Sequence, residues 1–168
     1  MRIRFKMTEQ LLLEVRKDLF RPHRFAAERV GFLAGRVGSL VPSGLIVLAH
    51  GYHAVEDDDY VDHPGAGATI NSAAMRKALQ FAYQNNTAMF HVHMHTHVGL
   101  PSFSRVDERE SAQFVPDFWN VQPQIPHGAI ILSLDSAIGK CWCPRIPEPK
   151  PITEFVFVGW RMRCVWNV

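Results

Sequence analysis

The stretch from His91 to Asp107 reads HVHMHTHVGLPSFSRVD, and four of the chain's nine histidines occupy alternate positions in its first half. In an extended strand, successive side chains point to opposite faces, so a strand would place all four imidazoles on one face. The other face would carry Phe90, Val92 and Met94, which predicts a buried core on that side. Packing gives little reason for a row of imidazoles, whereas neutral imidazole is the commonest metal-ligating side chain. The stretch therefore predicts a metal site on a half-buried strand.

A hydroxyl and a carboxylate follow the histidines. Ser104 and Asp107 have the spacing of a capping box at the start of a helix, and a cap alone would explain both residues. Asp107 is also close enough in sequence to act as a third ligand. Two histidines, one carboxylate and a water make a tetrahedral catalytic zinc site with an open position. The residues beside the histidines offer no obvious general base for such a site.

Size and composition set the class of protein. The chain has 168 residues, of which 47% are hydrophobic and 20% charged, and this is typical of one soluble globular domain spanning residues 1–168. The formal net charge of +2 gives no case for binding nucleic acid or an anionic membrane. No apolar run approaches the roughly 20 residues that cross a bilayer, and no apolar signal core follows the N-terminus.

Three cysteines lie late in the chain, at Cys141, Cys143 and Cys164. Their odd number and clustering favour reduced thiols in the cytoplasm over a disulfide framework. Cys141 and Cys143 are separated by one residue, which is also compatible with a metal pair. Because no second pair accompanies them, structural thiols are the favoured interpretation.

Hydrophobic periodicity and turn residues predict strands and helices along the whole chain. Thr8 and Asn71 are expected to cap helices that run to about Phe20 and Gln84. The second helix is expected to carry Met75, Leu79 and Ala82 on one face, with Ala78 and Phe81 beside them. A short helix opens at Ser104 and ends before Pro116. The expected strands are one around Ile3 and Phe5, a hairpin of residues 29–35 and 45–49, and then Thr87–His95, Gly128–Leu134, Lys140–Cys143 and Ile152–Trp166. This order predicts an α+β or α/β-like fold, in which helices flank a sheet.

Acidic residues gather in the loop between residues 55 and 67, where Glu56 is followed by three aspartates up to Asp59. Such a run is most often a solvated acidic face. A second cation site or a loop that contacts substrate is the less favoured alternative.

Taken together, these motifs resemble the JAB/MPN metalloproteases that carry the JAMM motif. That motif combines a remote glutamate, His-x-His, a loop usually of seven residues, and Ser-x-x-Asp. The family also carries Glu-x-x-Gly-x-Leu-x-Gly at the start of an early strand, and residues 28–35, ERVGFLAG, fit that pattern at every fixed position. Alone, Glu28 would be interpreted as a surface carboxylate. The resemblance implies that it is the general base, and it implies a mixed, partly curled sheet flanked by helices, with a layout like that of cytidine deaminases.

The register of the histidine pair departs from the family's pattern. The usual loop length would place the second ligand at Thr96, which cannot serve. His93 and His95 leave a loop one residue longer than usual, and His95 and His97 leave one that is one residue shorter. We favour His93 and His95, because an inserted residue bulges easily whereas a shortened loop must still span the same gap. His91 and His97 are then expected beside the ligands or facing substrate.

By this resemblance, His93, His95 and Asp107 would bind Zn²⁺ with water as the fourth ligand. Glu28 would act as general acid–base, and Ser104 would orient the attacking water or donate a hydrogen bond to the developing oxyanion.

The resemblance also implies the substrate. The chain is expected to be a bacterial-type zinc isopeptidase or peptidase that cleaves ubiquitin-like tails or conjugates. The tail would enter as an extended strand, and activating and conjugating enzymes are possible partners. A zinc amide hydrolase acting on small molecules remains an alternative. A non-catalytic scaffold is less favoured, because scaffold members typically lose the ligands.

Overall fold

The chain was analysed as a computed structural model, which describes all residues except 23, 25, 40–43, 63–66 and 160–168. Eight of its strands form one mixed sheet in the order β7-β6-β5-β4-β2-β3-β1-β8. The strands are β1 (Arg2–Thr8), β2 (Val30–Ser39), β3 (Gly44–Ala54), β4 (Ala88–Met94), β5 (His127–Leu132), β6 (Ala137–Trp142), β7 (Lys150–Pro151) and β8 (Glu154–Val158). The helices are α1 (Glu9–Leu19), α2 (Ser72–Asn85) and α3 (Arg105–Phe114), with short 3₁₀ helices η1 (Asp57–Asp59) and η2 (Val115–Asn120).

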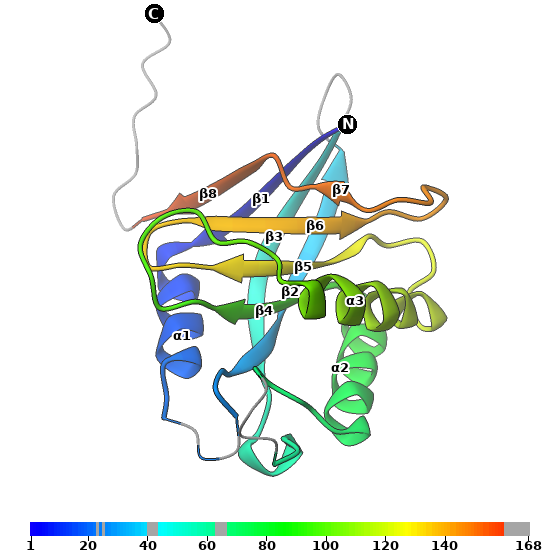
Figure 1. Ribbon diagram of the computed structural model, residues 1–168. Coiled ribbons are helices and arrows are strands. Elements are labelled where there is room, and N and C mark those ends of the chain that lie inside the picture. The colour runs from blue at the N-terminus through cyan, green and yellow to red at the C-terminus, as the bar shows by residue number, and fades with distance from the viewer. Residues whose placement is uncertain (23, 25, 40–43, 63–66, 160–168) are drawn as a thin grey trace, which may run out of the picture.

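The sheet is curled, and helices cover both of its faces (Figure 1). On one face, α1 packs its buried leucines and Val15 against β1, β3 and the Phe90, Val92 and Met94 side of β4. On the other face, α2 and η2 pack against β2 and Met89. The α+β class and the mixed, curled sheet flanked by helices are therefore confirmed, and so is the apolar core behind the histidine strand.

The helix boundaries follow from local capping. Thr8 accepts a hydrogen bond from the Leu11 N–H at 3.1 Å, and Asn71 accepts from the first-turn N–H groups of α2. Asn86 ends α2 in the left-handed conformation, with φ of 48°. Both predicted caps are confirmed.

The buried face of α2 agrees with the prediction in part. Ala82 and the neighbouring Ala78 are buried together with Ala74, whereas Met75 and Leu79 are only partly buried. Small side chains spaced four residues apart let the helix approach the sheet closely. The face that packs on the sheet is therefore selected by the small size of its side chains more than by their hydrophobicity.

Only part of the predicted C-terminal strand, Ile152–Trp166, lies within the described residues. Strand β8 runs from Glu154 to Val158, and residues 160–166 of the predicted strand, including Cys164, lie outside the described residues. Strand β8 pairs with β1 in parallel at one edge of the sheet, and β7 forms the other edge.

The acidic loop is not simply a solvated face. Arg29 donates to the Asp57 carboxylate at 2.6 Å, and Lys77 pairs with the buried Asp59 carboxylate at 2.5 Å. These ion pairs tie η1 to the start of β2 and to α2, because a buried carboxylate needs a partner. The second-cation alternative gains no support, since lysine and arginine occupy these carboxylates.

Candidate metal centre

Pairing between β2 and β4 explains how Glu28 meets the histidines across 65 residues of sequence. The two strands are antiparallel, with Phe32 opposite His91 and Val30 opposite His93. Directly opposed residues point to the same face. Continuing the register by two residues sets Glu28 opposite His95. The backbone N–H of Glu28 also donates to the Gly67 carbonyl at 3.2 Å, which holds this segment in place just before the start of β2.

Glu28, His93 and His95 form a group that could hold a metal ion: one ligand atom from each lies within 4.8 Å of the others. Around a tetrahedral zinc, bonds of about 2.1 Å set ligand atoms about 3.4 Å apart. His93 Nε2 lies 3.9 Å from Glu28 Oε2 and 3.7 Å from Asp107 Oδ1, both near that spacing. The structure thus brings both carboxylates to His93.

The ring nitrogen at the centre of the group has no hydrogen-bond partner. His93 Nε2 is buried, and it is one of three such side-chain atoms among the described residues. The other two belong to the guanidinium groups of Arg16 and Arg29, which form hydrogen bonds through other nitrogens. An unsatisfied buried polar atom costs about 1–3 kcal/mol. A metal ion at Nε2 would remove that cost, so the residues present fit a metal.

The four imidazoles do form one row. Ring centroids are 5.9 Å apart for His91 and His93, 5.2 Å for His93 and His95, and 5.7 Å for His95 and His97. The regular strand ends at Met94, and the His95 N–H continues the ladder by donating to the Leu132 carbonyl at 2.9 Å.

The two outer histidines have different surroundings. His91 packs edge-on against Phe32 and Phe114 and lies beside His93. Burial lowers its pKa to about 3. His97 is exposed in the bend after the strand, and its Nδ1 lies 3.1 Å from the Val98 carbonyl oxygen. Neither belongs to the group of Glu28, His93 and His95.

Asp107 is held by a capping box. Ser104 Oγ accepts from the Asp107 N–H at 3.1 Å, and Asp107 Oδ2 accepts from the Ser104 N–H at 2.7 Å. The cap therefore uses one carboxylate oxygen and leaves Oδ1 facing His93. Capping and metal binding are compatible here, because the cap fixes the carboxylate without consuming both oxygens. The Ser104 hydroxyl accepts in the cap and retains its own proton as a donor.

Further contacts anchor the segment that carries Ser104 and Asp107. Lys140 on β6 pairs with both oxygens of Glu108 at 2.5 Å and lies over the Phe103 ring at 5.1 Å. Earlier in the loop, Gly99 has a φ of 98°, which favours glycine, and its N–H donates to Asp135 at 2.7 Å. These ties fix the loop to the β5–β6 end of the sheet.

Electrostatics distinguish the members of the group. Burial, and to a smaller extent the Asp107 carboxylate, raises the pKa of Glu28, although the nearby His95 opposes the shift. Burial lowers the pKa of His93 to about 4, with Asp107 opposing. His93 is therefore a neutral imidazole at neutral pH, which is the form that binds metals.

Comparisons with known proteins add little to this geometry. No protein family model and no curated protein match the chain. A solved structure, the STIL N-terminal domain of Trichoplax adhaerens, is similar over 80% of this chain at 12% sequence identity and a TM-score of 0.35. The chain spans 39% of the length of that structure, and a likeness this low carries no argument about fold or function.

No helix in the described part of the chain is long and apolar enough to cross a membrane.

Proposed function

We propose that the chain is a zinc-dependent hydrolase of the JAMM type, acting as an isopeptidase or peptidase. The observation that carries the proposal is the buried, unpartnered His93 Nε2 facing two carboxylates, with His95 beside it. A solely structural histidine would be expected to have satisfied ring nitrogens.

The two carboxylates take different roles. Asp107 is the ligand in this proposal, because its capping hydrogen bond holds it rigidly with Oδ1 toward His93. His93 and His95 supply the imidazole ligands. Glu28 is the general base, because it is a partly buried carboxylate 3.9 Å from His93 Nε2, and burial raises its pKa and so makes it a stronger base.

Zinc, Glu28 and Ser104 have separate roles in the proposed reaction. Zinc, when bound, polarises the substrate carbonyl and lowers the pKa of water to about 7. Glu28 takes a proton from the attacking water and delivers it to the leaving amine. The Ser104 hydroxyl donates to the carbonyl oxygen as negative charge develops there.

Exposed apolar side chains beside the group support a peptidic substrate. Val98 and Leu100, on the loop that joins His95 to Ser104, are 72% and 73% exposed. The side chain of Leu134 is also exposed, and the backbone N–H of Leu134 donates a hydrogen bond to the His97 carbonyl. Exposed apolar side chains that gather on one surface are typical of a binding region, and the two on this loop are only two residues apart in sequence. Because β4 is paired along both sides, an extended tail would cross this loop and not add to β4 as a further strand. A ubiquitin-like tail is the proposed occupant, and the reduced cysteines favour a cytoplasmic setting.

Substitution of Glu28 tests the proposal. Glu28→Gln should keep one zinc per chain and lower the hydrolysis rate of a fluorogenic ubiquitin-like conjugate about 10²- to 10⁴-fold, because the base is lost. Bound zinc is measured by mass spectrometry of the metal after gel filtration, and rate by fluorescence. Glu14→Gln, an exposed glutamate on α1, is the matched control and should change neither. Full activity in Glu28→Gln, or wild-type protein that stays free of zinc when the ion is supplied, would refute the proposal.

A further inference from the structure

A cavity of about 740 Å³ lies at the end of the sheet opposite the metal centre. Ala88, the first residue of β4, lines it, whereas His93 is five residues further along the same strand, or about 17 Å. The cavity is therefore separate from the group of Glu28, His93 and His95. Its volume is in the range of pockets that hold a small molecule.

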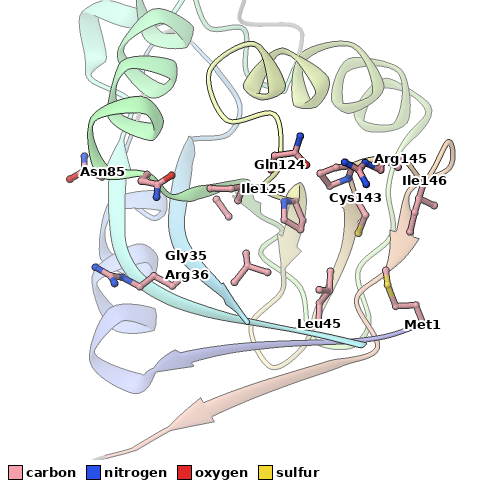
Figure 2. A pocket seen from close by; sticks show the side chains of 15 residues that line it. Met1, Gly35, Arg36, Leu45, Asn85, Gln124, Ile125, Cys143, Arg145 and Ile146 are labelled. Carbon is pink, nitrogen blue, oxygen red and sulfur yellow. The ribbon is translucent and has the colours of Figure 1, made fainter. Parts of the chain in front are cut away.

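The lining of this cavity combines apolar and basic side chains. Arg36 on β2 and Arg145 after β6 lie on opposite sides of it, and Leu45 and Ile125 lie between them (Figure 2). None of the described residues that line the cavity is acidic. An apolar body that carries negative charge is therefore complementary to the lining. Amide side chains, which can donate further hydrogen bonds, complete the polar part of the wall: Asn85, Asn86 and Gln124.

The two arginines of the cavity are not neutralised by the protein. Among the described residues, no carboxylate pairs with Arg36 or Arg145. Arg2 and Arg4, by contrast, both pair with Glu154. The two lining arginines are exposed, so their side chains can turn toward a bound group. Guanidinium groups bind carboxylates and phosphates through two parallel N–H donors, and these donors are free here.

The backbone of Arg145 gives a second, independent observation. Its φ of 66° lies in the left-handed region, which favours glycine. Arg145 follows Pro144 in a turn closed by the Ile146 N–H, which donates to the Cys143 carbonyl at 3.1 Å. Proline followed by a positive φ is the pattern of a type II turn, in which glycine or asparagine is usual at the position of Arg145. Backbone strain of this kind gathers at sites where a side chain is used, and this turn sets Arg145 in the cavity wall.

We propose that this cavity binds a small organic anion with an apolar body, with Arg145 as the direct partner of the anionic group and Arg36 adding favourable charge. The apolar body contacts Leu45 and Ile125. Binding forms no covalent bond. The inference goes beyond hydrolysis and is independent of it, because no lining residue belongs to the proposed zinc site.

The test compares two fluorescent probes that share an apolar body: the anion 1-anilinonaphthalene-8-sulfonate and the neutral N-phenyl-1-naphthylamine. Wild type should bind the anionic probe saturably. Arg36→Gln with Arg145→Gln should weaken that binding about 10-fold or more, because hydrogen bonds to a charged group are lost, and should change the affinity for the neutral probe less than about twofold. Lys17→Gln with Arg76→Gln is the matched control, because it removes two positive charges from exposed positions on α1 and α2 that do not line the cavity. This control should bind both probes as wild type does.

Three results would overturn the inference. The first is no saturable binding of the anionic probe to wild type. The second is an equal loss of affinity in the control variant. The third is equal weakening of both probes in the double arginine variant, which would show a cavity that does not select anions.

Arg145→Gly separates a role in binding from a role in the turn. Glycine adopts a positive φ without steric cost, so the temperature of unfolding should stay the same or rise while binding of the anionic probe weakens. Thermal unfolding and the same fluorescence titration measure the two effects on the full chain. Binding as tight as in wild type would refute Arg145 as the partner of the anion.

Discussion

Two buried histidines on adjacent parallel strands, His93 on β4 and His127 on β5, have almost the same burial and different surroundings. Burial lowers the pKa of each to about 4. At the start of β5, His127 Nδ1 accepts from the Met89 N–H at 3.1 Å, and Nε2 lies 3.4 Å from the Gln122 carbonyl oxygen. Its ring also stacks on Phe118 with centroids 5.2 Å apart.

His93, near the end of β4, has a buried Nε2 with no such partner and two carboxylates within 4 Å. Burial and pKa alone therefore do not separate a structural histidine from a candidate ligand. The hydrogen bonds of the ring nitrogens separate the two cases. A buried imidazole that supports the fold needs hydrogen bonds at both ring nitrogens, whereas a metal ligand must keep a nitrogen lone pair available for the ion.

The largest difference between the two histidines should be in metal content. His93→Ala should reduce bound zinc from about one per chain to below about 0.1, because a tetrahedral site loses a protein ligand. His127→Ala should leave zinc unchanged and lower the free energy of unfolding, because the Met89 N–H loses its acceptor. Metal analysis and urea unfolding measure the two effects. Equal zinc content in wild type and His93→Ala would show that His93 is not a metal ligand.

A second difference should appear in the dependence of stability on pH. The folded-state pKa of His127 is lowered from 6.5 to about 4, so its contribution is complete above pH 6.5 and is lost as pH falls toward 4. The loss is about 3 kcal/mol, since each pKa unit corresponds to about 1.4 kcal/mol. His127→Asn keeps an acceptor but does not titrate in this range. Urea unfolding at pH 7, 5.5 and 4.5, with zinc removed, should show a shallower decline for this variant, and parallel declines would contradict the assignment.

The smallest effect is expected at His97, which lies in the same row but is exposed. His97→Ala should retain one zinc per chain. Its zinc affinity should fall by less than about 10-fold, because removing a side chain that hydrogen-bonds to a metal ligand typically costs about 10- to 100-fold and His97 is not expected to make such a bond. Competition with a chromogenic zinc chelator measures this. Loss of the metal would instead favour His95 and His97 as the ligand pair.

Local chemistry made much of the fold predictable. Thr8, Asn71 and Ser104 are side chains that satisfy the free N–H groups of a helix start, and each caps the helix predicted for it. The buried face of α2 was predictable only in part, because it depends on how closely the helix approaches the sheet.

The candidate site was partly predictable for a related reason. The alternation of the histidines and the Ser-x-x-Asp spacing are local patterns, so they indicate the residues involved. The unsatisfied Nε2 of His93 and the satisfied nitrogens of His127 depend on neighbours from other strands and loops, which no local pattern contains.

By itself, the sequence determined that four imidazoles share one row, since alternation along an extended chain needs no partner. It also determined that Ser104 and Asp107 begin a helix. Only the tertiary structure decided that Glu28 lies with His93 and His95, through the pairing of β2 with β4, and that Asp107 keeps one oxygen free toward His93. The physical reason is that strand periodicity is local, whereas contact between residues 65 positions apart depends on which strands pair and in what register.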